Sequence, residues 1–325
     1  MAAVMIRKRQ APDGLFSPEA AAVDDGGGNK RPRHEFGSIY NYEKQEDLGE
    51  GTYGIVVKAR DKRTGETVAI KWIRHHVDLR AVCREADCLA ACRGHPSIVQ
   101  MKEVAADEVT GEVFIVMEFV GPSLHRRLTR ALSEGETRAV MRQLLAGAKT
   151  LHSTGTIHRD IKPDNILVGA GAQLKICDLG MATPVRPAGT PYPEETVAAL
   201  WYRAPELVMG FRNYGTAVDM WALGCVMAEL LIGEPLFGAA DTVDDMLSKV
   251  VSLCWMDPTE LHADLRGLSE AGRQVLRGLL SFEAEKRLTA ADALSHRWFD
   301  EEDAPLASVL CPPPPDRHRR FFYFL

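Results

Sequence analysis

Between residues 42 and 120, apolar positions come in short runs that favour strands over helices. Turn signals such as Thr64-Gly65 and Thr110-Gly111 separate the runs, and one longer stretch has helical spacing. Strands are predicted at 42–48, 55–61, 67–73, 98–104 and 113–119, and a helix is predicted at 78–92.

Beyond residue 124 the spacing of the apolar residues changes, and they recur every three or four positions. The clearest predicted helices are 136–153 and 216–232, and weaker ones are expected near 240–256, 269–281 and 289–295. A small β-rich lobe followed by a larger α-helical lobe places the chain in the α+β class.

The two ends of the chain differ from this body. Residues 1–37 are basic and Gly-rich with little periodic apolar content, and the end of the chain contains the run Pro312–Pro315. Four parts are therefore expected: a disordered tail over 1–37, the β-rich lobe over 38–120, the helical lobe over 121–300, and a Pro-rich tail over 301–325.

Composition narrows the function classes. The 325 residues are 46% apolar and 26% charged, which is ordinary for a globular protein. No run approaches the roughly 20 uncharged residues that cross a bilayer, so no membrane partner is expected. The seven cysteines form no CxxC pair, which favours reduced thiols inside the cell.

Charge argues against nucleic acid as a main ligand. The net charge is −6; residues 1–37 contribute +1 and residues 311–325 contribute +2, so the body between them carries −9. The basic runs Arg7–Arg9 and Lys30–Arg33 fit nuclear import or mere solubility equally well. The expected location is intracellular, nuclear or cytoplasmic or both.

A glycine-rich segment, Gly49-Glu50-Gly51-Thr52-Tyr53-Gly54, leads directly into the strand-like Ile55-Val56-Val57. Such glycines let backbone amides approach phosphate oxygens without a Cβ in the way. Because a strand follows instead of a helix, and no Gly-Lys-Ser/Thr is present, the segment predicts a β-hairpin over a nucleotide. The alternative is an ordinary glycine-containing hairpin turn.

Lys71 ends the apolar strand that contains Val68-Ala69-Ile70. Burying its ammonium group without an anion would be costly, so phosphate oxygens and a carboxylate are expected nearby. Glu85, in the predicted helix 78–92, is the best candidate for that carboxylate. The alternative is a surface lysine whose stem lies along apolar neighbours.

Further along, Ile157–Leu167 contains His158-Arg159-Asp160, Lys162 and Asn165, and Asp178 stands 13 residues after Asn165. With the glycine segment, Lys71 and Ala204-Pro205-Glu206, these motifs resemble the eukaryotic protein kinases in identity and order. The resemblance covers about 40–300 and implies the two-lobed kinase fold and the use of ATP with Mg²⁺.

The resemblance also implies a role for each motif residue. Asp160 and Lys162 would be catalytic, with Asp160 accepting or orienting the substrate hydroxyl proton, and Glu85 would fix Lys71. Asn165 and Asp178 would bind the metal. ATP would contact Leu48, Gly49, Glu50, Gly51, Thr52, Tyr53, Gly54, Ile55, Val56, Lys71, Glu118 and Val120.

Lys162, two residues after Asp160, is similar to serine/threonine kinases rather than tyrosine kinases. The stretches 200–210 and 219–225 resemble the cyclin-dependent and MAP-kinase-like group, and plant cyclin-dependent kinases of the F type are plausible neighbours. The resemblance implies protein substrates with Ser/Thr followed by Pro, with Arg203 shaping the pocket for that Pro, and a role in cell-cycle or transcription control.

Three departures from the group concern regulation. Residues 79–85 lack the cyclin-contact motif and keep only its final Arg-Glu, so a cyclin or other activator is possible but doubtful. Leu179 replaces the usual Phe after Asp178 and still supplies an apolar plug. Ala199 replaces the usual Ser or Thr near Asp160, which is expected to lower the rate.

The activation segment, 178–206, has Glu194 where cyclin-dependent kinases carry the activating Thr, seven residues before Trp201. A fixed carboxylate carries part of the charge of a phosphate, with Arg84 and Arg159 as candidate partners, so partial activity without phosphorylation is expected. A third Arg of the family's phosphate pocket corresponds to Thr183. The alternatives are phosphorylation of Thr190 or Thr196, or a merely solvated carboxylate at Glu194.

Thr52 and Tyr53 match the pair that inhibitory kinases modify in cyclin-dependent kinases, although both could simply shape the glycine loop. The predicted function is an ATP-dependent serine/threonine kinase. Two alternatives stay open: a catalytically weak or silent kinase fold acting as a scaffold, and a nucleotide-binding regulator without turnover.

Overall fold

The protein is described here by a computed structural model that covers residues 36–51, 54–73, 79–194, 196–255, 262, 265 and 267–311. The predictions for residues 1–35, Thr52, Tyr53 and 312–325 lie outside these described residues. The chain divides into two compact units: 1–86 with 101–119, and 87–100 with 120–325.

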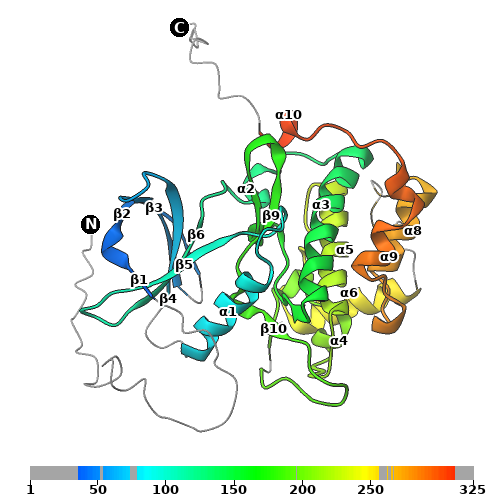
Figure 1. Cartoon of the computed structure of the whole chain (residues 1–325). Coiled ribbons are helices and arrows are strands. Elements are labelled where there is room, and N and C mark those ends of the chain that lie inside the picture. The colour runs from blue at the N-terminus through cyan, green and yellow to red at the C-terminus, as the bar shows by residue number, and fades with distance from the viewer. Residues whose placement is uncertain are drawn as a thin grey trace, which may run out of the picture. The chain divides into compact units, whose positions relative to one another are not determined.

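The first unit is built on a six-stranded sheet in the order β1-β5-β6-β4-β3-β2 (Figure 1). Its strands are β1 (Gly37–Ser38), β2 (Tyr42–Gly51), β3 (Gly54–Asp61), β4 (Thr67–Ile73), β5 (Met101–Ala106) and β6 (Val113–Glu118). All neighbours are antiparallel except β1 and β5, which pair in parallel. Helix α1 (Leu79–Ala91) follows β4 and contributes residues to both units.

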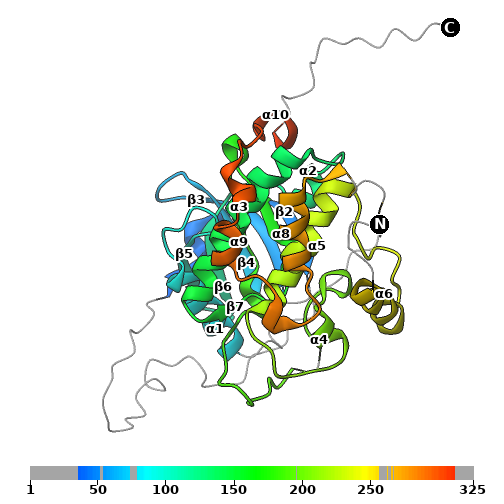
Figure 2. The same ribbon diagram turned by 90° about the vertical axis from the view of Figure 1, so that its right-hand side faces the viewer.

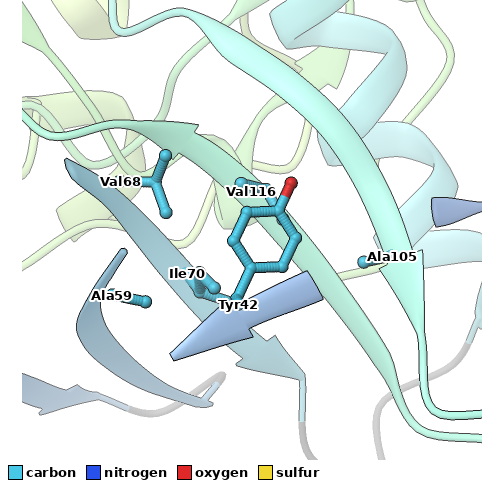
Figure 3. Close-up of a cluster of buried hydrophobic side chains, with 6 residues drawn as sticks. All are labelled: Tyr42, Ala59, Val68, Ile70, Ala105 and Val116. Carbon is cyan, nitrogen blue, oxygen red and sulfur yellow. The ribbon is translucent and has the colours of Figure 1, made fainter. Parts of the chain in front are cut away.

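Alternating positions of these strands form a small apolar core on one face of the sheet (Figure 3). Val68 and Val116 are fully buried there, and the Tyr42 ring belongs to the same cluster. The Tyr42 hydroxyl reaches the edge of this core, where it donates to Glu103 and accepts from Arg63 Nη2 at 3.0 Å. The core fixes the register of the strands that carry the candidate nucleotide-binding residues.

The second unit is mainly helical, and its centre is formed by α3 (Glu134–Ser153) and α5 (Ala217–Ile232) (Figure 1). Helix α3 packs against α5 and α9 (Ala290–Leu294), and α5 also packs against α8 (Glu270–Leu279). Around them lie α2 (Leu124–Arg127), α4 (Pro205–Val208), α6 (Val243–Trp255) and α10 (Ala307–Leu310); Figure 2 shows α6 at the margin, where it contacts α4.

Helix α3 begins at a well-formed cap. The Ser133 hydroxyl accepts from Glu136 N, and Glu136 accepts in return from Ser133 N at 2.7 Å, which is a capping box. Leu144, Leu145 and Leu151 are fully buried along one face, as their helical spacing predicts.

Four short strands carry the loops of the candidate site. They are β7 (Thr156–Ile157), β8 (Ile166–Val168), β9 (Leu174–Ile176) and β10 (Thr183–Pro184). Strand β8 pairs with β9, and β10 pairs with β7, both antiparallel. These strands are too short to give a periodic signal, and the sequence pattern did not predict them.

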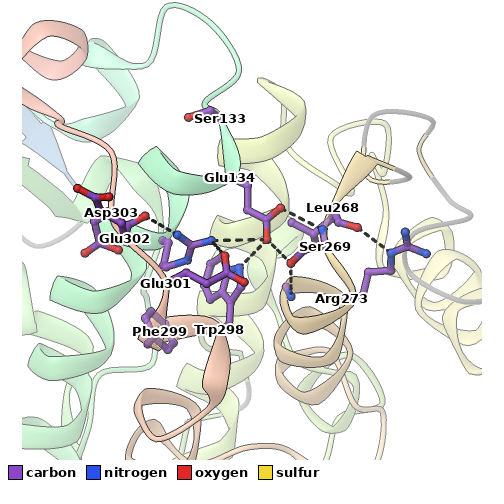
Figure 4. A network of polar contacts seen from close by, with 12 residues as sticks. Ser133, Glu134, Leu268, Ser269, Arg273, Trp298, Phe299, Glu301, Glu302 and Asp303 are labelled. Atoms are coloured by element: carbon purple, nitrogen blue, oxygen red, sulfur yellow. Dashed lines mark hydrogen bonds and ion pairs between the residues drawn. The ribbon is translucent and has the colours of Figure 1, made fainter.

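Glu134, at the start of α3, ties three distant segments together (Figure 4). It accepts from the Ser269 backbone and hydroxyl at 3.0 and 2.6 Å, and from Trp298 Nε1 at 2.7 Å. Arg138 lies 5.3 Å from the Trp298 ring. The network joins the starts of α3 and α8 to the end of the helical body.

Residues 300–311, which begin at the edge of the predicted C-terminal tail, run back along α3. Arg142 pairs with Asp303 at 2.8 Å, and Arg138 pairs with Glu301. Leu310, in α10, is fully buried, and α10 contacts α2 and the short helix Ala170–Ala172. We call residues 300–311 the C-terminal strap. Among the described residues, no helix is both long and apolar enough to traverse a bilayer.

Candidate active site

The glycine-rich segment forms the predicted hairpin between β2 and β3. Gly49 pairs with Val56, Glu50 with Ile55, and Gly51 with Gly54. A Cβ on Gly54 would come within 1.9 Å of the Trp72 carbonyl oxygen on β4, whereas a Cβ on Gly49 would meet nothing within 4 Å. Gly54 is thus required by the close approach of β4, whereas the space beside Gly49 on the outer strand is open.

Lys71 and Glu85 meet inside the first unit. Lys71 Nζ lies 2.7 and 2.8 Å from the two Glu85 oxygens, and both side chains are about 95% buried. The register of β4 places Lys71 opposite Val56 on one side and Ile115 on the other. This is the pairing that the sequence predicted, and it offsets the cost of burying the ammonium group.

Two of the predicted residues in the candidate catalytic loop bind Asp160. Lys162 Nζ and Asn165 Nδ2 each donate to Asp160 Oδ2 at 2.9 Å. The other oxygen, Oδ1, accepts from the Ala199 backbone amide at 3.0 Å. Asp160 is therefore fixed by three donors, with a cation beside it.

The buried carboxylate of Asp219 binds the backbone of this loop. Asp219, on α5, accepts from the His158 and Arg159 amides at 2.8 and 2.9 Å and from His152 Nε2 at 2.9 Å. Burial alone would raise the pKa of Asp219, but these hydrogen bonds hold it below its ordinary value. The loop backbone is thus anchored to α5, most of whose residues are buried.

The two candidate metal ligands stand at one end of the β8–β9 hairpin. Asn165 immediately precedes β8, Asp178 follows β9, and Cys177 N donates to Asn165 O at 2.9 Å across the pair. Asn165 Nδ2 donates twice toward Asp160, which directs the amide oxygen away from it. An amide oxygen and a carboxylate are hard ligands that fit Mg²⁺ bound with phosphate oxygens.

Backbone strain concentrates at this site. Among the described residues, four non-glycine residues have positive φ, and three of them are Arg159 at 69°, Asp178 at 59° and Ala198 at 68°. Such conformations cost about 1 kcal/mol or more each and persist only where neighbours impose them. Three of the four described residues of this kind therefore lie in the candidate catalytic loop or the activation segment.

Arg159 connects the catalytic loop to the activation segment. Its Nε donates to Met181 O at 2.6 Å, and its Nη1 and Nη2 donate to the two Glu194 oxygens at 3.1 and 3.2 Å. Nη1 also donates to the Tyr214 hydroxyl at 3.0 Å. The predicted Arg159–Glu194 pair is therefore present in the structure.

The other candidate regulatory residues lie in different surroundings. Thr190 and Thr196 are exposed. Thr183 is buried in β10, where it pairs with Ile157. Ala199 supplies only its backbone amide to Asp160.

Arg203 bonds to one of the strained residues: its Nη2 donates to the Ala198 carbonyl oxygen at 2.9 Å. Glu206 is bound by Arg287 through two bonds of 2.9 and 3.0 Å. Together they fix both ends of the stretch Ala198–Glu206.

The strand β6 ends at Glu118, which pairs with Val68, and Met117 is buried. Val120, the first residue of the second unit at this point, is half-buried. A Cβ on Gly121 would lie 2.3 Å from Val168 O, so the chain after Val120 is pressed against β8. Leu48, Ile55 and Val56 are half-buried on the hairpin.

Sequence reasoning missed Tyr192, Tyr214 and Ala198. The two tyrosine rings stack with centroids 4.4 Å apart, although they lie 22 positions apart in the sequence. No spacing rule could have paired them. The only available signal was an aromatic residue in an otherwise Pro- and Gly-rich loop.

The comparisons agree with this geometry. Residues 42–299 match the family described as the protein kinase domain. The chain belongs to that family. It is 42% identical over 300 residues to the putative cyclin-dependent kinase F-2 of Oryza sativa subsp. japonica, covering 81% of this chain and 91% of the relative.

Two further relatives carry similar names. Cyclin-dependent kinase G-1 of Oryza sativa subsp. indica is 36% identical over 323 residues, covering 87% of this chain and 46% of the relative. Cyclin-dependent kinase 10 of Mus musculus is 34% identical over 326 residues, covering 89% of each. The chain is therefore a cyclin-dependent-kinase-like member of the family, and the predicted two-lobed α+β kinase class is confirmed.

Proposed function

We propose that this chain is an ATP-dependent protein serine/threonine kinase that prefers Pro after the phosphorylated residue. The observation that carries the proposal is the Asp160 cluster, in which Lys162 and Asn165 bind one carboxylate oxygen and Ala199 N binds the other. A carboxylate held in this way can accept a proton from a substrate hydroxyl placed against it.

The other candidate residues divide the remaining work. Lys71, held by Glu85, would bind phosphate oxygens, and the glycine hairpin would offer backbone amides to the same phosphates. Asn165 and Asp178 would hold Mg²⁺, which when bound neutralises phosphate charge as it is transferred. Lys162, beside Asp160, would balance the charge on the transferred group.

The proline preference rests on Ala198 and Arg203. With φ at 68°, the Ala198 carbonyl turns toward Arg203, which donates to it at 2.9 Å. That oxygen is then engaged and does not serve as an acceptor for the amide of the residue after the substrate hydroxyl. Pro has no amide hydrogen, so a Pro after the substrate hydroxyl loses no hydrogen bond. Any other residue at that position would leave its N–H without a partner.

Protein substrates are the partners that fit the family, and the names of three relatives contain the words cyclin-dependent. We propose that the chain transfers phosphate without a cyclin, inside the cell in the nucleus, the cytoplasm or both. A role in cell-cycle or transcription control would follow from its substrates.

The test is phosphate transfer by the purified chain alone. Paired peptides that differ only as Ser-Pro and Ser-Ala would be incubated with Mg-ATP, beside Asp160→Asn. We expect transfer that falls about 10²- to 10⁴-fold in the variant, and a preference for Ser-Pro of about 10-fold to 100-fold, the cost of an unpaired amide.

Thermal stabilisation by Mg-ATP separates the alternatives. Stabilisation of the wild type without any transfer would contradict the proposal in favour of a nucleotide-binding regulator. Neither stabilisation nor transfer, with or without added cyclins, would favour a scaffold. Equal rates on Ser-Pro and Ser-Ala peptides would contradict the proposed proline preference but not the proposed kinase activity.

A further inference from the structure

Tyr192 is buried in the middle of an exposed loop. Residues 184–191 before it are all exposed, yet the exposed fraction of Tyr192 is 1%. Its ring stacks on Tyr214, with centroids 4.4 Å apart and planes 24° apart. The guanidinium groups of Arg159 and Arg186 lie 5.6 and 5.1 Å from the same ring, within range for cation–π attraction.

The polar groups of Tyr192 are also bound. Its hydroxyl accepts from Arg186 N at 3.0 Å and donates to Pro184 O at 3.3 Å. Its amide donates to Arg212 O at 2.8 Å, and Arg212 Nε donates back to its carbonyl at 2.7 Å. Ring, hydroxyl and backbone are therefore all held by partners from outside residues 187–196.

Arg159 links this tyrosine to the catalytic loop. A guanidinium has five N–H groups, and four of those of Arg159 already bond Met181 O, the two Glu194 oxygens and the Tyr214 hydroxyl. An added phosphate could bind Arg159 with two bonds only by displacing Glu194. The guanidinium of Arg159, the residue before Asp160, is thus already bonded to groups that the unmodified chain carries.

We infer that Tyr192 is a positioning residue that pins the activation segment and, with Glu194, makes phosphorylation of Thr190 or Thr196 unnecessary for the substrate-binding arrangement. The inference rests on the proposed kinase activity. Ala198 and Ala199 follow Glu194 by four and five residues, and Ala199 N binds Asp160. A segment pinned at Tyr192 and Glu194 holds this stretch in place before any substrate arrives.

The test compares the purified wild type with Tyr192→Leu, which removes ring and hydroxyl, and Tyr192→Phe, which keeps the stacking and loses the hydroxyl bonds. Tyr40→Leu, at a tyrosine that is 54% exposed, is the matched control. Each protein is treated with phosphatase, with untreated wild type alongside. The measurements are kcat, KM for a Ser-Pro peptide, KM for ATP, and hydrogen exchange of residues 183–199.

We expect phosphatase treatment to leave the wild-type rate within about twofold. Tyr192→Leu should raise the peptide KM about tenfold or more, leave the ATP KM within about twofold, and speed exchange over 183–199. Tyr192→Phe should restore most of the peptide KM and exchange, because stacking and cation–π contacts survive. Tyr40→Leu should change none of these.

A tenfold loss of rate on phosphatase treatment, or unchanged peptide KM and exchange in Tyr192→Leu, would overturn the inference. If Tyr192→Leu loses its cooperative melting transition, Arg186→Gln replaces it, since that change removes one guanidinium from the ring and leaves the core intact. If the wild type transfers no phosphate, the proposed function fails. Exchange over 183–199 then still decides whether Tyr192 pins the segment.

Discussion

Arg159 binds both carboxylate oxygens of Glu194 across 35 positions of sequence, at 3.1 and 3.2 Å. Burial disfavours the charged form of Arg159, but its bonds to Glu194 and Tyr214 more than offset this and raise its pKa. The residue before the candidate catalytic aspartate is therefore tied to the activation segment by a charged side chain that needs no modification.

Removing the charge of Glu194 should weaken this tie. We expect Glu194→Ala to lower kcat/KM for a Ser-Pro peptide by about 5-fold to 30-fold, since a charge-assisted pair of this kind contributes about 1–2 kcal/mol. The kcat/KM of Glu194→Gln should lie between that of Glu194→Ala and that of the wild type. A rate unchanged in Glu194→Ala, measured on purified enzyme, would show that the carboxylate is merely solvated.

Arg203 should control proline preference rather than overall rate. In Arg203→Met the Ala198 carbonyl loses its donor and can accept from a substrate amide, so the ratio of rates on Ser-Pro and Ser-Ala peptides should fall about tenfold. Arg203→Lys, which keeps a donor, is the control. Equal loss of both rates in Arg203→Met would point instead to a damaged activation segment.

Gly54 and Gly49 offer a matched pair in the glycine hairpin. A Cβ at Gly54 would overlap the Trp72 carbonyl oxygen at 1.9 Å, and a Cβ at Gly49 would meet no atom within 4 Å. Gly54→Ala should therefore lower the Tm by several degrees, because β3 must shift away from β4. Gly49→Ala should leave the Tm within about one degree. Similar melting curves for the two variants would contradict the geometry.

Acid should weaken the start of α3. The hydrogen bonds from Arg130, followed by those from Ser133, lower the pKa of Glu136 from 4.5 to about 2. A carboxyl with a depressed folded-state pKa stabilises the fold above its unfolded value, and this contribution is lost as the pH falls from about 4.5 to about 2. The free energy of unfolding should decline over that window.

Two variants separate this effect from general acid denaturation. Glu136→Gln should be less stable at pH 7 and should show a shallower decline between pH 4.5 and pH 2. Glu43→Gln, at an exposed position, should follow the wild type. If the free energy of unfolding declined equally with falling pH in Glu136→Gln and wild type, the Arg130 bonds to Glu136 would not contribute to stability.

Local sequence pattern predicted the long elements well, because their apolar spacing is strong. The predicted helix 136–153 corresponds to α3, and the predicted helix 216–232 corresponds to α5. The predicted strand 98–104 began too early: β5 starts at Met101, and Ile98 instead forms an isolated bridge with Ile176. That bridge depends on a partner 78 positions away, which local pattern does not reveal.

The candidate site was predictable where its residues are close in sequence or share a motif. Asp160, Lys162 and Asn165 lie within six positions, and a single loop brings them together. Tyr192 and Tyr214 could not be paired, because their contact depends on how the activation segment packs against the rest of the second unit. Ala198 was missed for a related reason: a positive φ at alanine has no sequence signature.

The kinase match ends at Phe299, yet the C-terminal strap continues to Cys311. Arg138 is about 96% buried and bonds to Glu301 and the Glu302 carbonyl, so a protein cut after Phe299 would leave a buried cation short of acceptors. The cut would also expose to solvent the surface that Leu306 and Leu310 cover. The stably folded part of this kinase is therefore expected to extend beyond the matched residues 42–299 and to include the strap.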